Sequence, residues 1–165
     1  MNRIGIVINS LFSSQIAYYA LRNINTNLTK DYLTNFIFFV KRMEVPCVEP
    51  ECGVMRWEEL WGFDGKVITT DIEGTRKTLK VPGPTDIWYY VYDLEWMRIG
   101  RNTHKYEELA SIYQNRSIKI IARNEEYAKI IERVWNRKPE GIAEDFDLNK
   151  ILPLIGVQNE KATSN

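Results

Sequence analysis

The sequence contains no long hydrophobic run. None of its apolar stretches approaches the roughly 20 residues that a membrane-spanning helix needs. The apolar run within the opening residues MNRIGIVINS is also too short for the hydrophobic region of a secretory signal. The sequence therefore predicts a cytoplasmic protein without a membrane partner.

Residues that bind metals or form disulfides are scarce. The chain has two cysteines, Cys47 and Cys52, and one histidine, His104, which is distant from both in sequence. A structural zinc site normally takes four ligands from closely spaced cysteine and histidine pairs. A disulfide would not persist in a reducing compartment. We therefore expect no metal site and two unpaired thiols.

Net charge is absent as well, because 22 Lys and Arg residues balance 22 Asp and Glu residues. A domain that binds nucleic acid usually carries a basic excess or patch, so this balance disfavours a nucleic-acid partner. The length of 165 residues fits one domain. We expect a single α/β domain over residues 1–157 and a flexible C-terminal tail over residues 158–165.

Glycine-rich phosphate loops are missing too. The sequence contains neither a G-x-G-x-x-G pattern nor a Walker-type loop, so it predicts no cofactor of the usual nucleotide kind. The turn after the first apolar run is instead rich in hydroxyl groups. Ser10, Ser13, Ser14 and Gln15 are candidates for contacting a polar ligand at the start of a helix. Capping of that helix by Ser13 or Ser14 explains the same residues.

Apolar runs alternate with segments of helical periodicity along most of the chain. This alternation predicts a doubly wound, mostly parallel α/β sheet of about six strands with helices on both faces. No strand is predicted between residues 41 and 65, where proline and glycine interrupt the pattern and MRWEELWG indicates at most a short helix. The expected strands are residues 3–8, 35–40, 66–70, 86–92, 117–122 and 141–145.

Polar residues follow three of the expected strands and end a fourth. They are Asp71, Asp93 with Glu95, Arg123 with Asn124, and Glu144 with Asp145. The carboxyl ends of parallel strands share one edge of a sheet, so we expect these side chains to line a ligand-binding rim. Asp93 and Glu95 are the candidate general bases, and the others are candidate ligand contacts. Each of them can instead cap a helix.

Aromatic residues offer one further candidate. Trp88 lies in a predicted strand and Trp135 on an apolar helical stripe, so both are expected in the core. Trp96 lies in the loop after a strand and is the candidate platform for stacking on a sugar or a base.

Three segments, YYVYDLEWMR (89–98), YEELASIYQN (106–115) and the stretch from Ile120 to Ile151, resemble the glycosyltransferase-like proteins of large tailed bacteriophages. The opening RIGIVINSLFSSQIAYYAL resembles them more loosely. The resemblance implies a Rossmann-like domain that forms half of a GT-B fold, encoded by a phage and located in the host cytoplasm.

A GT-B enzyme has two Rossmann domains, reacts in the cleft between them and grips its nucleotide-sugar donor mainly with the second. The resemblance covers one domain, so it implies a partial or partner-dependent transferase without an obligatory metal. Its expected partners are a nucleotide sugar or sugar acceptor, and a protein partner or second copy that completes the cleft. In such an enzyme Asp93 or Glu95 would deprotonate the acceptor. The alternative is a non-catalytic module that binds a phage or host protein.

Overall fold

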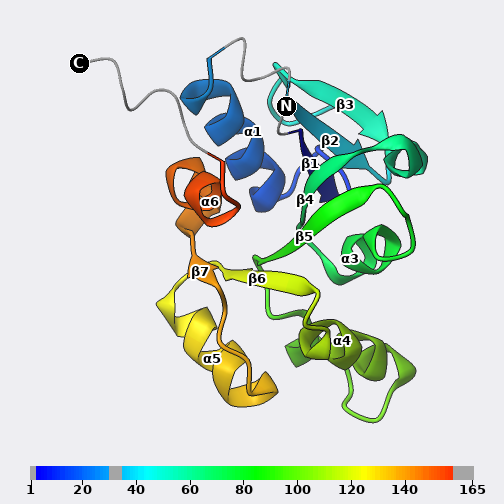
Figure 1. Cartoon of the computed structure of the whole chain (residues 1–165), viewed down its shortest axis with the longest axis vertical. Coiled ribbons are helices and arrows are strands. Elements are labelled where there is room, and N and C mark those ends of the chain that lie inside the picture. The colour runs from blue at the N-terminus through cyan, green and yellow to red at the C-terminus, as the bar shows by residue number, and fades with distance from the viewer. Residues whose placement is uncertain (1–2, 30–34, 158–165) are drawn as a thin grey trace.

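The computed structural model describes residues 3–29 and 35–157, so the expected tail at 158–165 lies outside the described residues. One sheet of seven strands, all parallel, forms the centre in the order β3-β2-β1-β4-β5-β6-β7 (Figure 1). The strands are β1 (Ile4–Ile8), β2 (Phe36–Val40), β3 (Gly53–Arg56), β4 (Gly65–Thr69), β5 (Pro84–Val91), β6 (Ile118–Ala122) and β7 (Gly141–Ile142). The prediction of a doubly wound parallel sheet is confirmed.

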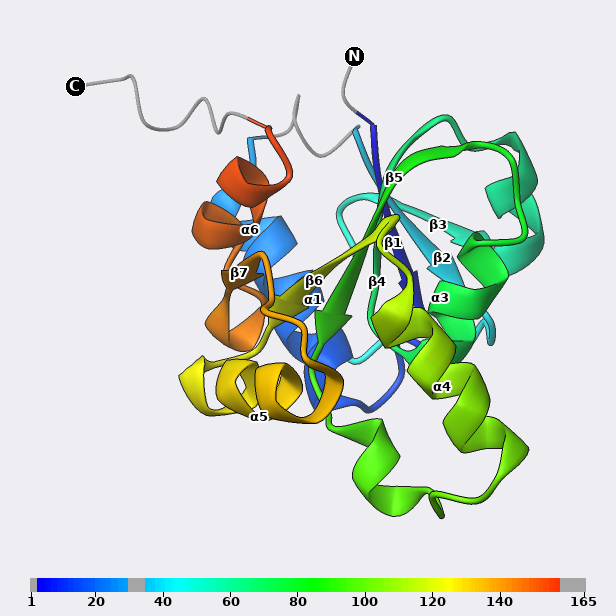
Figure 2. The ribbon, with the colours of Figure 1, turned by 60° about the horizontal axis from the view of Figure 1, so that its bottom comes forward.

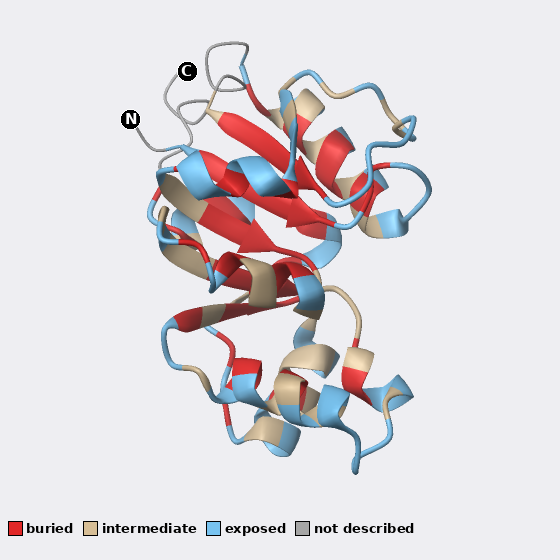
Figure 3. Ribbon diagram, turned by 90° about the vertical axis from the view of Figure 1, so that its right-hand side faces the viewer, coloured by how far each residue is buried: buried red, intermediate tan, exposed pale blue. Residues whose placement is uncertain are grey.

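Helices cover both faces of this sheet. α1 (Gln15–Asn27) and α6 (Leu148–Leu154) pack on one face, and α3 (Ile72–Thr78), α4 (His104–Gln114) and α5 (Glu125–Trp135) pack on the other (Figure 2). Three short 3-10 helices complete the described elements: η1 (Trp57–Gly62), η2 (Glu95–Arg98) and η3 (Glu144–Phe146). Because both faces are covered, β1 and β2 consist entirely of buried residues (Figure 3).

Strand β3 was not predicted from the sequence. It forms one edge of the sheet and pairs with β2 alone, in the register Phe38 to Val54. Gly53, Met55 and Arg56 are exposed, so β3 shows neither the continuous apolar run of a central strand nor a regular alternation. Without either pattern, the pairing with β2 decides its conformation.

Four helices begin where capping residues predict. The side chains of Ser14, Asp71, Thr103 and Asn124 accept hydrogen bonds from backbone N–H groups in the first turns of α1, α3, α4 and α5. Such caps satisfy donors that have no partner inside the helix. For Asp71 and Asn124, capping is therefore at least part of their role.

The last expected strand, residues 141–145, is shorter than predicted. β7 ends at Ile142, because Asp145 and Phe146 have φ angles of 47° and 58°, which are incompatible with a strand. Hydrogen bonds fix this turn: the Tyr90 hydroxyl donates to the Ala143 carbonyl at 2.7 Å and accepts from the Phe146 N–H at 3.0 Å. The Asn23 amide donates to the Asp145 carbonyl at 2.8 Å.

Candidate functional site

The strand order reverses between β1 and β4, because the chain runs outward from β1 to β3 and then returns to the other side of β1. Open α/β sheets bind ligands in the crevice outside the carboxyl ends of the strands at such a switch point. A pocket of about 490 Å³ lies here. Its polar lining comes from the turns after β1, β2 and β4: Asn9, Ser10, Ser13, Ser14, Arg42, Glu44, Thr70 and Asp71. We call it the switch-point pocket.

Ser10 and Glu44 form one side of the switch-point pocket. Ser10 is 9% exposed, and its hydroxyl accepts from the Phe12 N–H at 3.0 Å and donates to Glu44 Oε2 at 2.5 Å. Arg42 lies on the same side, with Nε 3.8 Å from Glu44 Oε2. The Glu44 side chain is 37% exposed, so it retains acceptor capacity toward the pocket.

Thr70 and Asp71 form the opposite side. The buried Thr70 hydroxyl donates to the Val7 carbonyl at 3.1 Å, which ties the end of β4 to β1. Asp71 Oδ1 accepts from the Gly74 N–H at 2.6 Å as the cap of α3. Burial raises the pKa of Asp71, and this hydrogen bond opposes the shift only in part. Asp71 is therefore more basic than a carboxylate in water.

This lining favours a neutral, hydroxylated ligand. One carboxylate from each side of β1, Glu44 and Asp71, accepts hydrogen bonds, and the serine and threonine hydroxyls both donate and accept them. An anionic group inside the pocket would be repelled by Glu44 and Asp71, whereas one lining residue, the exposed Arg42, would attract it. The turn after β1 has no glycine that would let a phosphate approach its backbone closely.

The structure brings most of the predicted rim residues together in two groups. Ser10, Ser13, Ser14 and Asp71 line the switch-point pocket. Gln15, Arg123 and Asp145 lie beside it, joined through Tyr92: the Tyr92 hydroxyl donates to Gln15 Oε1 at 2.8 Å, and the Arg123 guanidinium stacks on the Tyr92 ring. Asn124 caps α5 and Glu144 begins η3.

The two candidate bases, Asp93 and Glu95, do not line the switch-point pocket. Asp93 pairs with Arg98 at 2.7 Å near the surface. Glu95 turns inward, where Oε1 accepts from the Ile72 N–H and the Tyr89 hydroxyl, each at 3.1 Å. Burial, with the nearby charge of Asp71, raises the pKa of Glu95 to about 7. Glu95 thus supports the helix that Asp71 caps.

Trp96 is buried and is not the exposed stacking platform that the sequence predicted. It is 6% exposed and makes edge-to-face contacts with Tyr113 and Trp135, at centroid distances of 5.0 and 5.6 Å. Its ring belongs to the core between the sheet, α4 and α5 rather than to a platform for sugars or bases. The 3-10 turn η2 directs Trp96 inward, and a loop position in the sequence does not reveal that direction.

Sequence reasoning missed four polar residues of the rim: Arg42, Glu44, Thr70 and Tyr92. Arg42 and Glu44 follow β2, and β2 lies next to β1. That adjacency is the signal that could have found them, once the strand order was known.

The described part of the chain contains neither a metal-binding group nor a membrane-spanning helix. Residues 3–29 and 35–157 contain no group of three or more His, Cys, Asp or Glu residues that could hold a metal ion. No helix in these ranges is long and apolar enough to cross a bilayer. Both cysteines are free; Cys47 is exposed, and burial raises the pKa of Cys52 to about 11.

The fold and the pocket define a Rossmann-like α/β domain with a polar site at its switch point. Comparisons with protein-family models, curated proteins and solved structures find no significant match to this chain.

Proposed function

We propose that the chain is a glycosyltransferase-like domain that binds a sugar, a nucleotide sugar or a hydroxylated acceptor in the switch-point pocket. The observation behind this proposal is the pair of carboxylates, Glu44 and Asp71, that enter one pocket from the strands flanking β1. Carboxylates and hydroxyls in one pocket match the hydrogen-bonding groups of a sugar. The resemblance of residues 89–98, 106–115 and 120–151 to phage glycosyltransferase-like proteins supports the same class.

Asp71 is the best candidate for deprotonating an acceptor hydroxyl. It lines the pocket, unlike Asp93 and Glu95, and its raised pKa makes it a stronger base at neutral pH. In a GT-B arrangement this domain would supply one wall of the cleft. Transfer would therefore need a partner domain or a second copy to hold the donor.

Replacing Asp71 by asparagine is expected to weaken sugar binding by about tenfold or more, because a hydrogen bond to a charged group contributes about 1.5–3 kcal/mol. Asparagine remains a good helix cap, so α3 should keep its stability. Glu44→Gln should have a similar effect from the other side of the pocket. Titration calorimetry and thermal shift against a panel of sugars and nucleotide sugars measure both variants.

Asp93→Asn is the matched control, because Asp93 lies near the surface and does not line the pocket. Its affinities should equal those of the parent protein. If no member of the panel binds at millimolar concentration, or if Asp93→Asn weakens binding as much as Asp71→Asn does, the proposal fails.

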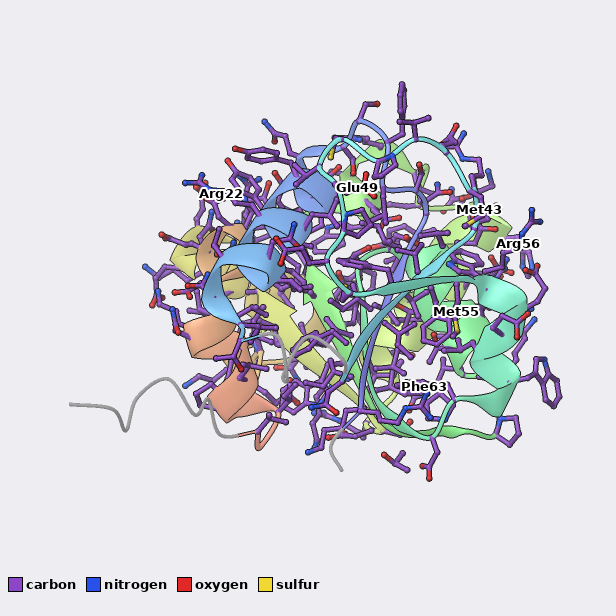
Figure 4. The ribbon with its side chains drawn as sticks, turned by 90° about the horizontal axis from the view of Figure 1, so that it is seen from above. Arg22, Met43, Glu49, Met55, Arg56 and Phe63 are labelled. Atoms are coloured by element: carbon purple, nitrogen blue, oxygen red, sulfur yellow. The ribbon has the colours of Figure 1, made fainter. Side chains whose placement is uncertain are left out.

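A second candidate function, binding of another protein, is favoured by the edge of the sheet at β3. Within residues 3–29 and 35–157 no strand pairs with the outer side of β3. Apolar side chains of β3 and of the segment between β2 and β3 are exposed: Met43 by 54%, Val45 by 78% and Met55 by 42%. Figure 4 shows Met43, Met55 and Arg56 on this side of the molecule, away from Arg22 of α1. An exposed edge can accept an extended segment of a partner as an added strand.

Under this second function, Val45→Glu and Met55→Glu should each reduce recovery of a bound partner by about tenfold, because a buried unpaired charge costs several kcal/mol. Asp71→Asn should leave that recovery unchanged. Quantitative pull-down from expressing cells measures the effect. Equal recovery with all three variants would contradict this function.

A further inference from the structure

A second polar group lies on the same rim as the switch-point pocket. It consists of Gln15, Tyr92, Arg123 and Asp145, which come from the start of α1, the ends of β5 and β6, and η3. The Arg123 guanidinium carbon lies 4.2 Å from the centroid of the Tyr92 ring, and the Tyr92 hydroxyl donates to Gln15 Oε1 at 2.8 Å. We call this group the Arg123 cluster.

Arg123 is held in place with its hydrogen-bonding capacity unused. Its side chain is 29% exposed, and within residues 3–29 and 35–157 no hydrogen bond from its guanidinium is found. Asp145 Oδ1 is 3.8 Å from Arg123 Nη2, which is beyond hydrogen-bonding distance. Stacking on Tyr92 occupies one face of the guanidinium and leaves the N–H groups at its edge free to bind a carboxylate or a phosphate.

The turn that carries Asp145 has a fixed backbone. The positive φ angle of Phe146, 58°, is costly for a bulky residue, yet Tyr90 and Asn23 fix the turn by hydrogen bonds. The backbone of Asp145 is therefore fixed, and its carboxylate, 3.8 Å from Arg123 Nη2, competes with any external anion for Arg123.

The Arg123 cluster adjoins the switch-point pocket, because Gln15 directly follows Ser14, which lines that pocket. Glu44 and Asp71 make the pocket itself unfavourable for an anion, whereas Arg123 offers unused donors next to it. We propose that Arg123, supported by Tyr92, binds the anionic group of a ligand whose hydroxylated part lies in the pocket. The ligand class is then a sugar or similar polyol that carries a phosphate or a carboxylate, an inference that rests on the proposed function.

Inorganic diphosphate tests the Arg123 cluster without relying on the pocket. In a titration of the full chain followed by NMR, diphosphate should shift the backbone amides of Tyr92, Arg123 and Asn124. Arg123→Gln should weaken this binding by about tenfold or more. Arg123→Lys should weaken it by about threefold to tenfold, because lysine keeps the charge and loses the planar fork.

Asp145→Asn separates anion binding from a purely structural role. It removes the competing charge and should strengthen diphosphate binding by about twofold to fivefold. If Arg123 and Asp145 formed only a structural ion pair, Asp145→Asn would loosen Arg123 and weaken diphosphate binding instead. Thermal unfolding of each variant checks the fold; if Arg123→Gln fails to fold, Arg123→Lys and Asp145→Asn decide. The inference is overturned if diphosphate causes no shift, if Arg123→Lys leaves the affinity unchanged, or if Asp145→Asn lowers it.

Neutral sugars and sugar phosphates, measured with the parent and with Asp71→Asn, separate this inference from the proposed function. A sugar phosphate should bind more tightly than its neutral sugar, and Arg123→Gln should remove the difference. Diphosphate binding without any sugar binding would overturn the pocket function and, with it, the joint ligand. Sugar binding that is unaffected by a phosphate group would overturn the Arg123 cluster alone.

Discussion

Replacing Arg137 by methionine is expected to lower the free energy of unfolding by about 3–5 kcal/mol. Arg137 is 3% exposed and donates to the carbonyls of Tyr113 at 3.0 Å, Asn115 at 2.7 Å and Ile118. These carbonyls end α4 and begin β6. Methionine fills a similar volume but leaves the acceptors without this donor, and each buried unsatisfied group costs about 1–3 kcal/mol. Urea denaturation at neutral pH measures the loss.

Arg116→Met is the matched control, since Arg116 is exposed and lies in the turn between α4 and β6 whose carbonyls Arg137 binds. It should change the free energy of unfolding by less than about 0.5 kcal/mol. Comparable losses in the two variants would show that the buried contacts of Arg137 contribute nothing specific.

Glu95→Gln is expected to flatten the pH dependence of stability. Burial raises the pKa of Glu95 in the folded protein from 4.5 to about 7. Because the folded state holds this proton more tightly, its stabilising effect is complete below about pH 4.5 and is lost as the pH rises through 7. Relative to the variant, the parent should therefore lose on the order of 2–3 kcal/mol between pH 5 and pH 8.

Urea denaturation at a series of pH values measures this difference, and NMR titration of the Glu95 carboxyl measures its pKa directly. Glutamine keeps an acceptor for the Ile72 N–H and the Tyr89 hydroxyl, so the variant should fold and should be the more stable protein at pH 8. Parallel stability profiles for the two proteins would contradict a buried Glu95 with a raised pKa.

Central strands and helix starts were predictable because they depend on local signals. The fully apolar strands β1 and β2 and the caps Ser14, Thr103 and Asn124 follow from short stretches of sequence. β3 was not predictable, because it lies at an edge and its conformation depends on pairing with β2.

The candidate site was predicted in part for the same reason. A polar residue after a parallel strand must lie on the common rim, which places Ser10, Asp71 and Arg123 there. The strand order decides which of them meet, and local periodicity does not contain it. The direction of a side chain in a loop is equally hidden, so Glu95 turns into the protein although it follows a strand as Asp71 does.

The contrast between the two thiols makes this chain suitable for selective chemical labelling. Only a thiolate reacts readily with maleimides, and burial raises the pKa of Cys52 to about 11, so we expect exposed Cys47 to be modified at neutral pH well before Cys52. The Cys47 N–H donates to the Leu11 carbonyl at 2.8 Å, which ties it to the turn after β1. A fluorophore attached there would report ligand entry in the natural sequence, with no engineered cysteine.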